Sequence, residues 1–214
     1  MATPYLITAA VGYLLGALPF GYLVARARGV NIFEVGSRNP GATNVRRVLG
    51  SGPGNLVFAL DALKGAIAAF APYGYHLALE RGETSPEAPI AYLQMTGLVA
   101  ALLGHSFSCF TRFRGGKGVA TGAGGFAVLF PVGALIALLV WSLTAFATRF
   151  VSAASILAAV SLPVTALALE RDRVFVGACI AVAALVVFRH RSNLARIAAG
   201  TESRIGRKKE TPQS

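Results

Sequence analysis

Two glycine-rich, cationic segments hold the residue types and spacings that could do chemistry in this chain. Residues 36–44 read GSRNPGATN and residues 114–118 read RGGKG, with an apolar run following directly from Val119. Glycine frees the backbone from Cβ clashes, so neighbouring N–H groups can converge on one point. A helix beginning at Val119 would add unpaired N–H groups and the positive end of its dipole, which favour an anion such as phosphate. The pattern of glycines and cations therefore predicts that the two segments bind phosphate.

Neither segment fits a nucleotide-hydrolysing P-loop. In residues 36–43 the glycine spacing nearly matches, but Ala42 stands where a P-loop carries its lysine. In residues 111–118, Thr111 and Gly118 occupy positions that require a glycine and a serine or threonine. An ordinary turn or a positively charged loop would explain the charges alone. It would not explain the density of glycines and small hydrogen-bonding side chains, which favours a phosphate cradle.

Two histidines lie at the ends of apolar runs. His190 is flanked by Arg189 and Arg191, and their positive charge disfavours imidazolium, so we expect a neutral ring that can accept a proton. A role at the membrane edge explains the arginines, but not the histidine or the nearby Asn193. For His105 the favoured interpretation is a helix-end histidine bonded to the backbone, and a substrate contact is the alternative.

Two polar pairs lie inside apolar runs. Asp61 and Lys64 are three residues apart, so they share one helix face and are expected to pair as structural support for the bundle. Ser152 and Ser155 have the same spacing, which is typical of helix packing through small residues, with a substrate contact as the alternative. The sequence contains no HExxH pattern, carboxylate pair or Cys/His cluster, so we expect neither a metal nor a cofactor.

The composition places these features in a membrane protein. Of the 214 residues, 55% are hydrophobic and 14% are charged, against about 25% charged residues in soluble domains. Mean hydropathy is +0.61. The net charge of +11 is of the kind that membrane proteins gather in cytoplasmic loops, so it does not require nucleic acid as a partner.

We expect an all-α, polytopic membrane protein built as a seven-transmembrane-helix bundle. A kink is expected near Pro19 and a division between two short spans at Pro131. The predicted spans are residues 5–25, 56–79, 91–105, 119–130, 132–147, 153–169 and 174–188. Residues 1–200 then form a single transmembrane domain, and residues 201–214 form a basic cytoplasmic tail that is partly disordered.

The distribution of positive charge predicts the orientation of this bundle. Loops on one side carry 16 lysine and arginine residues, and loops on the other side carry 3. Cytoplasmic loops are the ones enriched in lysine and arginine. The N-terminus is therefore expected outside, with both glycine-rich segments and the C-terminal tail in the cytoplasm.

Four motifs in matching order resemble the acyl-phosphate-dependent glycerol-3-phosphate acyltransferases, the PlsY family of bacterial inner membranes. They are residues 36–44, residues 104–107 with 115–121, residues 149–155 and residues 189–193, within a resemblance that extends over residues 12–205. Three places depart from the family pattern. Arg38 replaces a glycine, Ser108 and Cys109 stand at a proline position, and Arg114 replaces a lysine.

The resemblance implies an enzyme of the bacterial plasma (inner) membrane with a cytoplasmic active site and no cofactor. It would transfer an acyl group from acyl-phosphate to the 1-hydroxyl of glycerol 3-phosphate, giving lysophosphatidic acid and phosphate among membrane lipids. Its catalytic residues would be Ser37 and His190. Its substrate-binding residues would be Asn39, Gly41, Thr43, Asn44, Arg47, His105, Gly115, Gly116, Lys117, Gly118, Ser152, Ser155 and Asn193.

This chemistry needs no covalent acyl-enzyme, because an acyl-phosphate is a mixed anhydride that carries its own good leaving group. What remains is to hold two anions, offset their repulsion and deprotonate a hydroxyl. Arg47 and Lys117 would supply positive potential. The base is either His190 or a phosphate oxygen of the donor, and the sequence leaves both open.

Two other classes of protein would use similar residues. A membrane transporter of a phosphate ester or another anion also combines glycines and cations, but transporters usually carry internal repeats and helices broken near the midplane. No repeat is evident here, and the motifs lie at span ends. A lipid-binding scaffold would not need His190, Asn193 and two glycine-rich segments. The oligomeric state stays open.

Overall fold

The computed structural model describes residues 3–80 and 89–206, and all regular structure in these ranges is helical. The predicted all-α class is therefore confirmed for the described part of the chain. Two compact units follow each other along the sequence, Met1–Ala134 and Leu135–Ser214. Each unit is described by itself below, and the single transmembrane domain predicted over residues 1–200 stays a prediction.

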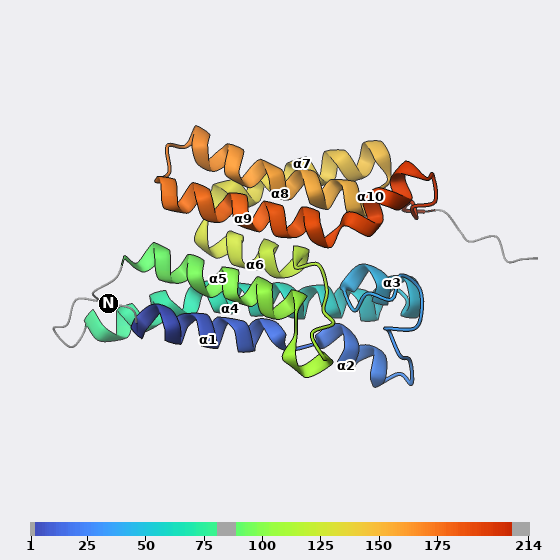
Figure 1. Ribbon diagram of the computed structural model, residues 1–214, viewed down its shortest axis with the longest axis horizontal. Helices are drawn as coiled ribbons and strands as arrows, with labels where there is room; N and C mark the ends of the chain where they lie inside the picture. Colours follow the sequence, from blue (N-terminus) through green and yellow to red (C-terminus); the bar gives the residue numbers. More distant parts are fainter. Residues whose placement is uncertain (1–2, 81–88, 207–214) are drawn as a thin grey trace, which may run out of the picture. The chain divides into compact units, whose positions relative to one another are not determined.

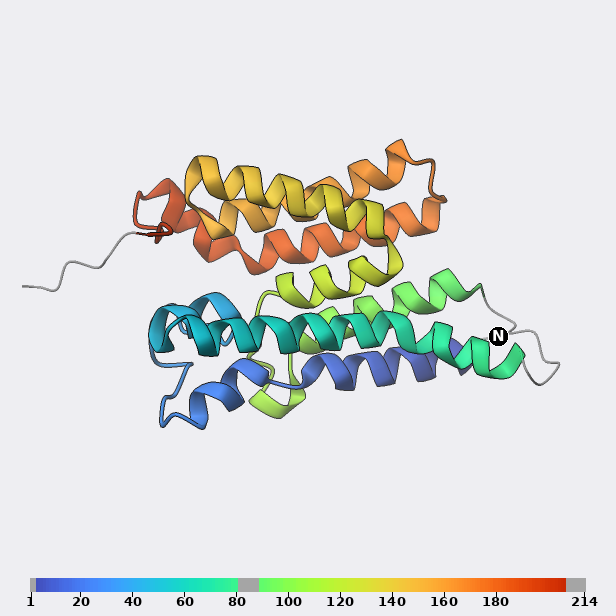
Figure 2. The same ribbon diagram turned by 180° about the vertical axis from the view of Figure 1, so that it is seen from behind.

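The first unit is built around three long helices. α1 (Thr3–Ala17) packs against α5 (Ile90–Ser106), and both contact α4 (Ser51–Glu80). The shorter α6 (Val119–Leu129) lies along α4. Figures 1 and 2 show these four helices running side by side within the unit. Their ends carry the connecting segments that contain the glycine-rich motifs.

Prolines break the helices at the two predicted places. Pro19 separates α1 from α2 (Phe20–Arg26), and Pro131 opens α7 (Pro131–Thr148) directly after α6. Proline lacks the N–H group that would continue the helical hydrogen-bond ladder. The kink and the division are thereby confirmed. α6 has only 11 residues, so at about 1.5 Å per residue it is much shorter than a hydrocarbon core of about 30 Å.

Five segments in the described residues have the length and apolar composition of a membrane span. They are Thr3–Arg26, Ser51–Gly74, Ile90–Thr111, Pro131–Thr148 and Val151–Ala168. A sixth is added if the bent pair of helices Arg173–Arg189 and Arg191–Ala198 counts as one span. The polytopic architecture is thus supported. The predicted number of seven is not confirmed, because α6 is too short to count on its own.

Two helices lie where no membrane span is predicted. α3 (Ala42–Leu49) lies between the first two predicted spans, and α10 (Arg191–Ala198) lies in the basic region after the last one. Both are short and polar, so no long apolar run marks them. α3 is still fixed by packing, because Val45 is fully buried in a cluster with Ala25 and Ile32.

The second unit contains most of α7 together with α8 (Val151–Ala168), α9 (Arg173–Arg189) and α10. α8 and α9 lie along each other (Figure 1). After α10 the chain returns to the start of α8, where the N–H of Ile205 donates to the carbonyl oxygen of Arg149 over 2.8 Å. Residues 201–206 therefore lie against this unit. Residues 207–214 of the predicted tail lie outside the described residues.

Candidate active site

The first glycine-rich segment is closed into a turn by one side chain, Asn44 of α3. The Oδ1 atom of Asn44 accepts hydrogen bonds from the backbone N–H of Ser37 over 2.8 Å and from Nη1 of Arg47 over 3.2 Å. Its Nδ2 donates to the carbonyl oxygen of Val35 over 3.1 Å. Asn44 is buried. A single buried amide therefore fixes both the turn and the direction of the Arg47 guanidinium.

Polar side chains of this segment remain on the surface of the first unit. Ser37, Thr43 and Arg47 are all exposed, and they offer two hydroxyls and a guanidinium to an anion. Asn39 instead accepts a hydrogen bond from the N–H of Gly41 over 2.9 Å, so these two residues shape the turn. The segment therefore presents mainly side-chain donors.

Arg38 adopts the backbone conformation that suits a glycine. Its φ of 56° lies in the left-handed region, which costs a residue with a side chain about 1–2 kcal/mol and costs glycine nothing comparable. With arginine in place of the family's glycine, the backbone at position 38 keeps the left-handed conformation of the turn, and it is strained there. The Arg38 side chain itself is exposed.

The second glycine-rich segment is seated on the C-terminal end of α5. The N–H of Gly116 donates to the carbonyl oxygen of His105 over 3.0 Å. A Cβ at Gly116 would collide with Nε2 of the His105 ring, and a Cβ at Gly115 would collide with the His105 carbonyl oxygen. This close approach explains why glycines are needed here. Gly118 then caps α6, with the half-buried Lys117 just before it.

The residue at the family's proline position closes the end of α1. Ser108 is buried, and its hydroxyl donates to the carbonyl oxygen of Ala17, the last residue of α1, over 2.5 Å. The hydroxyl of Tyr13 donates to the neighbouring carbonyl oxygen of Phe107 over 2.8 Å. Carbonyl groups at a helix end have no partner within the helix. Ser108 thus couples the second segment to the first helix.

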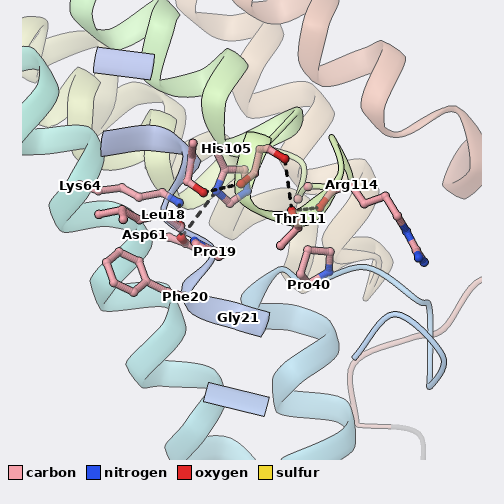
Figure 3. Close-up of a pocket in the computed structure, with 14 residues that line it drawn as sticks. Leu18, Pro19, Phe20, Gly21, Pro40, Asp61, Lys64, His105, Thr111 and Arg114 are labelled. Atoms are coloured by element: carbon pink, nitrogen blue, oxygen red, sulfur yellow. Dashed lines mark hydrogen bonds and ion pairs between the residues drawn. The ribbon is translucent and has the colours of Figure 1, made fainter. Parts of the chain in front are cut away.

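The two glycine-rich segments lie close together in the first unit, because Pro40 of the first and Arg114, Gly115 and Gly116 of the second line one pocket. The guanidinium carbon of Arg114 lies 4.5 Å from the ring centroid of Phe33, and its Nη2 lies 3.5 Å from the Phe33 carbonyl oxygen. In addition, α2 packs so closely on the first segment that a Cβ at Gly21 would collide with the Pro40 carbonyl oxygen. Figure 3 shows Pro40, Gly21 and Arg114 around the same pocket. This geometry agrees with the prediction that both segments face one side of the membrane.

A buried charged cluster lies beneath the second segment (Figure 3). Lys64 Nζ is 2.8 Å from Oδ1 of Asp61, and the same oxygen is 3.5 Å from Nδ1 of His105. The predicted Asp61–Lys64 pair is therefore confirmed. The favoured interpretation of His105 as a histidine bonded only to its own helix backbone is wrong, because its ring faces a carboxylate on α4. Sequence spacing cannot show this contact, which arises where α4 and α5 pack.

The second unit carries a cluster of its own around Glu202. Oε1 of Glu202 accepts hydrogen bonds from the hydroxyl of Ser152 over 2.8 Å and from Nδ2 of Asn193 over 2.6 Å, and Oε2 accepts one from Nε of Arg196 over 2.7 Å. Burial opposes the carboxylate charge, but the bonds from Asn193, Ser152 and Arg196 outweigh it and hold the pKa of Glu202 below its ordinary value. The cluster joins α8, α10 and the chain beyond α10.

His190 ends α9 with a defined ring orientation. The ring is buried, and Nδ1 lies 2.8 Å from the carbonyl oxygen of Val186. A carbonyl oxygen can only accept, so Nδ1 carries the hydrogen, and the neutral ring has its lone pair on Nε2. This tautomer is compatible with the predicted role as a proton acceptor.

Comparison with known proteins decides the family. The glycerol-3-phosphate acyltransferase sequence profile matches residues 6–200. A glycerol-3-phosphate acyltransferase of Desulforamulus reducens is 42% identical over 198 residues, which are 92% of this chain and 93% of the relative. Glycerol-3-phosphate acyltransferase 1 of Deinococcus radiodurans is 42% identical over 208 residues, 97% of this chain and 99% of the relative. The chain belongs to the glycerol-3-phosphate acyltransferase family.

Solved structures agree with this family assignment. The acyltransferase chain is similar to a crystal structure of PlsY (YgiH), an integral membrane glycerol 3-phosphate acyltransferase, in its glycerol 3-phosphate form. The TM-score is 0.82 at 37% identity, covering 94% of this chain and 96% of the other. For the crystal structure of the lysophosphatidic acid form, the TM-score is 0.79 at 36% identity, covering 94% of this chain and 95% of the other. The resemblance inferred from the sequence motifs is confirmed.

The predicted site residues of this acyltransferase fall into two groups, one in each unit. The first unit holds Ser37, Asn39, Gly41, Thr43, Asn44, Arg47, His105, Gly115, Gly116, Lys117 and Gly118. The second unit holds Ser152, Ser155, His190 and Asn193. In the first group, His105, Gly115 and Gly116 line one pocket together with Pro40 of the first segment. In the second group, Ser152 and Asn193 share the Glu202 carboxylate. Contacts of either group with substrates stay predictions.

Ser155 is engaged within its own unit. Its hydroxyl donates to the carbonyl oxygen of Val151 over 2.8 Å and accepts from Nε1 of Trp141 over 3.3 Å. Its side chain is buried. These contacts agree with the alternative of helix packing, although they do not test substrate binding.

Sequence reasoning missed two residues that organise these clusters in the acyltransferase, Glu202 and Phe33, and one contact, that of Asp61 with His105. Glu202 has a signal in the sequence, because it is a rare acid in the basic stretch after Arg189. The contact between Asp61 and His105 has no signal in the sequence. The contact between the Phe33 ring and Arg114 has none either. No group of three or more His, Cys, Asp or Glu side chains that could hold a metal occurs among the described residues.

Proposed function

We propose that this protein transfers an acyl group from an acyl-phosphate to the 1-hydroxyl of glycerol 3-phosphate, giving lysophosphatidic acid and inorganic phosphate for phospholipid synthesis. Family membership makes it a glycerol-3-phosphate acyltransferase. The observation that carries the proposal is that two cationic, glycine-rich segments line one pocket of the first unit, with Arg114 of the second segment in contact with Phe33 just before the first. Two phosphate-bearing substrates call for two such segments.

In the proposed reaction the glycerol hydroxyl oxygen attacks the acyl carbon, and a carbon–oxygen bond forms there. The bond from that carbon to the phosphate oxygen breaks, and phosphate leaves with the electron pair. The hydroxyl proton passes either to Nε2 of His190 or to a phosphate oxygen of the donor. Because the donor is already activated, preorganised positive charge supplies the remaining stabilisation of the transition state.

Exposed and half-buried polar groups of the first unit suit direct contact with substrate. Ser37 and Thr43 offer hydroxyls, and Arg47 and Lys117 offer positive charge. Ser37 would orient the reacting hydroxyl or the donor. The buried Asn44 would act by holding Ser37 and Arg47 in place, since its amide already bonds to both.

The second unit supplies the remaining proposed groups. His190, whose Nδ1 lies 2.8 Å from the Val186 carbonyl oxygen, is the proposed second catalytic residue. Ser152 and Asn193 donate to Glu202, so a phosphate bound by them would share donors with that carboxylate. These roles come from the family resemblance together with the chemistry of the side chains.

The setting proposed for this reaction is the inner membrane of a bacterium. The protein would cross it seven times, with α6 as a short fourth span and residues 1–200 as one transmembrane domain. The N-terminus would lie outside, and both glycine-rich segments would lie at the cytoplasmic face. The excess of lysine and arginine in the loops of one side supports this orientation.

An assay with purified protein tests the proposal. Acyl-phosphate and glycerol 3-phosphate should give lysophosphatidic acid, whereas acyl-coenzyme A in place of the acyl-phosphate should not. Lys117→Ala serves as the inactive control, because the loss of one preorganised electrostatic contact typically costs about 10²–10³-fold in rate. Equal rates with acyl-coenzyme A would refute the choice of donor. Uptake of glycerol 3-phosphate into vesicles without acyl transfer would favour a transporter instead.

A further inference from the structure

The proposed reaction assigns no step to the cluster beneath the second glycine-rich segment, of which only His105 is predicted to contact a substrate. The side chains of Asp61, Lys64 and His105 are 3%, 4% and 8% exposed, on segments with the composition of membrane spans. Removing charges from water is costly, and a buried ion pair can often be replaced by apolar residues without loss of stability. Stability alone therefore does not explain why these groups lie here.

His105 is in contact with the backbone of the second segment at two points. Its carbonyl oxygen accepts the N–H of Gly116 over 3.0 Å. Its ring lies so close to the same residue that a Cβ at Gly116 would collide with Nε2. The opposite ring nitrogen, Nδ1, faces the Asp61 carboxylate at 3.5 Å. The imidazole is thus held between the carboxylate on α4 and the residue that precedes Lys117.

Lys64 connects this support to the break between α1 and α2. Its Nζ donates to the carbonyl oxygen of Leu18 over 2.8 Å while pairing with Asp61 over 2.8 Å. The Leu18 carbonyl lies at the break made by Pro19, where the helical ladder is interrupted. Three separate parts of the first unit, namely the helix break, α4 and the end of α5, therefore meet at one carboxylate.

The cavity beside the cluster is too small for a substrate. It is lined by Asp61, Lys64 and His105 together with Gly115, Gly116 and the helix break, and its volume is about 10 Å³ (Figure 3). A single water needs about 10–15 Å³ by this measure, so glycerol 3-phosphate does not fit. In this structure the cluster contacts the second segment directly, through His105 and Gly116.

We infer that Asp61, Lys64 and His105 are positioning residues that set the placement of the Gly115–Gly118 backbone and of Lys117, and thereby the affinity for a phosphate-bearing substrate. This inference rests on the proposed function. The ligand chemistry is a phosphate monoester or an acyl-phosphate. Kinetics with each substrate varied in turn distinguish the two.

Replacement of the ion pair by apolar residues separates positioning from stability. In Asp61→Leu/Lys64→Met the thermal unfolding temperature should be unchanged or higher, because two buried charges are removed together. The KM for one phosphate-bearing substrate should rise by at least about tenfold, because the groups that hold its phosphate are displaced. The kcat should fall as well, because the displaced Lys117 also stabilises the transition state. Wild-type KM values for both substrates in a folded variant would overturn the inference.

A double-mutant cycle between His105 and Gly116 tests the contact itself. Gly116→Ala alone should raise KM strongly, because its Cβ meets the His105 ring. In the His105→Ala background the ring is gone, so adding Gly116→Ala should raise KM by less than about threefold, a strongly non-additive result. Gly177→Ala is the matched control, since a Cβ there meets nothing within 4 Å. Strict additivity of His105→Ala and Gly116→Ala would refute the proposed support.

A binding measurement keeps this inference distinct from the proposed function. Thermal stabilisation by glycerol 3-phosphate and by inorganic phosphate is recorded for the wild-type protein, the apolar double variant and the cycle variants. A wild-type protein that is stabilised by these ligands but forms no lysophosphatidic acid would refute the reaction and leave the positioning role testable. Equal stabilisation of the wild-type protein and the apolar double variant would refute the positioning role and leave the reaction intact.

Discussion

The side-chain oxygen of Asn44 accepts a hydrogen bond from the backbone N–H of Ser37 over 2.8 Å, which ties the first glycine-rich segment to α3. The same amide donates to Val35 and accepts from Arg47. The sequence predicts that Asn44 binds substrate, yet its hydrogen-bonding groups are engaged within the protein. Its influence on catalysis would then pass through Ser37 and Arg47.

Asn44→Ala should weaken both folding and catalysis. The free energy of unfolding should fall by about 1–3 kcal/mol, because buried partners of the amide are left unsatisfied. We expect kcat/KM to fall at least tenfold, roughly the effect of a positioning error well below 1 Å. Thermal unfolding in detergent and initial rates measure the two effects. Thr43→Ala, on the exposed face of α3, is the comparison for stability. Wild-type stability of Asn44→Ala would contradict this account of the turn.

Arg38→Gly should relieve strain in the same turn. The left-handed φ of 56° costs arginine about 1–2 kcal/mol, against about 0.5–1 kcal/mol for the extra unfolded-state freedom of glycine. A small net stabilisation is therefore expected, measurable by thermal unfolding. Arg38→Ala keeps the strain and removes the charge. If both variants lose activity equally, the arginine side chain contacts a substrate phosphate. If only Arg38→Gly is impaired, the restricted backbone conformation is what matters.

Apolar length and proline positions made much of the fold predictable. The runs that became α4, α5, α8 and α9 were visible because each is long and apolar. α3 was not, because an eight-residue helix with two arginines has no such run, and its burial depends on Val45 meeting residues far along the chain. Likewise, the spacing of Asp61 and Lys64 predicts their pair. The approach of His105 depends on how α4 and α5 pack, which no local pattern encodes.

Labelling from the two sides of the membrane should reveal the proposed orientation. Cys109 is exposed beside the second glycine-rich segment, so a membrane-impermeant thiol reagent should reach it only from the cytoplasmic side. In a Cys109→Ser background, Arg171→Cys between α8 and α9 should react only from the outer side. Cys179 is buried and should stay silent. Reaction of both positions from one side would contradict the predicted topology.

Because of Glu202, the stability of the folded protein should fall at acid pH. Hydrogen bonds from Asn193, Ser152 and Arg196 overcome the opposing effect of burial and lower the pKa of this carboxyl from 4.5. Because the unfolded chain binds the proton more readily, the stabilisation is complete above the ordinary value and is lost as pH falls through the folded-state pKa. Thermal unfolding recorded from neutral pH down to about pH 3 should show this loss. Glu202→Gln should flatten that part of the curve, and an unchanged slope would rule out Glu202 as its source.

Substitution of His190 distinguishes the two candidate bases, Nε2 of His190 and a phosphate oxygen of the donor. If Nε2 of His190 takes the proton, His190→Ala should abolish the limb of the kcat/KM profile that arises where an imidazole titrates. If a donor phosphate oxygen takes it, the same substitution should lower the rate through lost positioning and leave the shape of the profile intact. His190→Asn is the comparison, because its amide can keep a donor near the Val186 carbonyl oxygen that Nδ1 now contacts. We expect the second result, since an acyl-phosphate brings both a base and a leaving group.

Ser37→Ala should be severe under either mechanism, because Ser37 is proposed to orient a substrate without carrying the acyl group. Loss of a preorganised hydrogen-bond donor typically costs about 10²–10³-fold in rate. Intact mass measurement of the wild-type protein mixed with acyl-phosphate alone provides the decisive check. No adduct should form, because in the proposed reaction the glycerol hydroxyl attacks the donor directly. A stable acyl group on Ser37 would overturn both versions and establish a covalent intermediate, with Ser37 as the nucleophile.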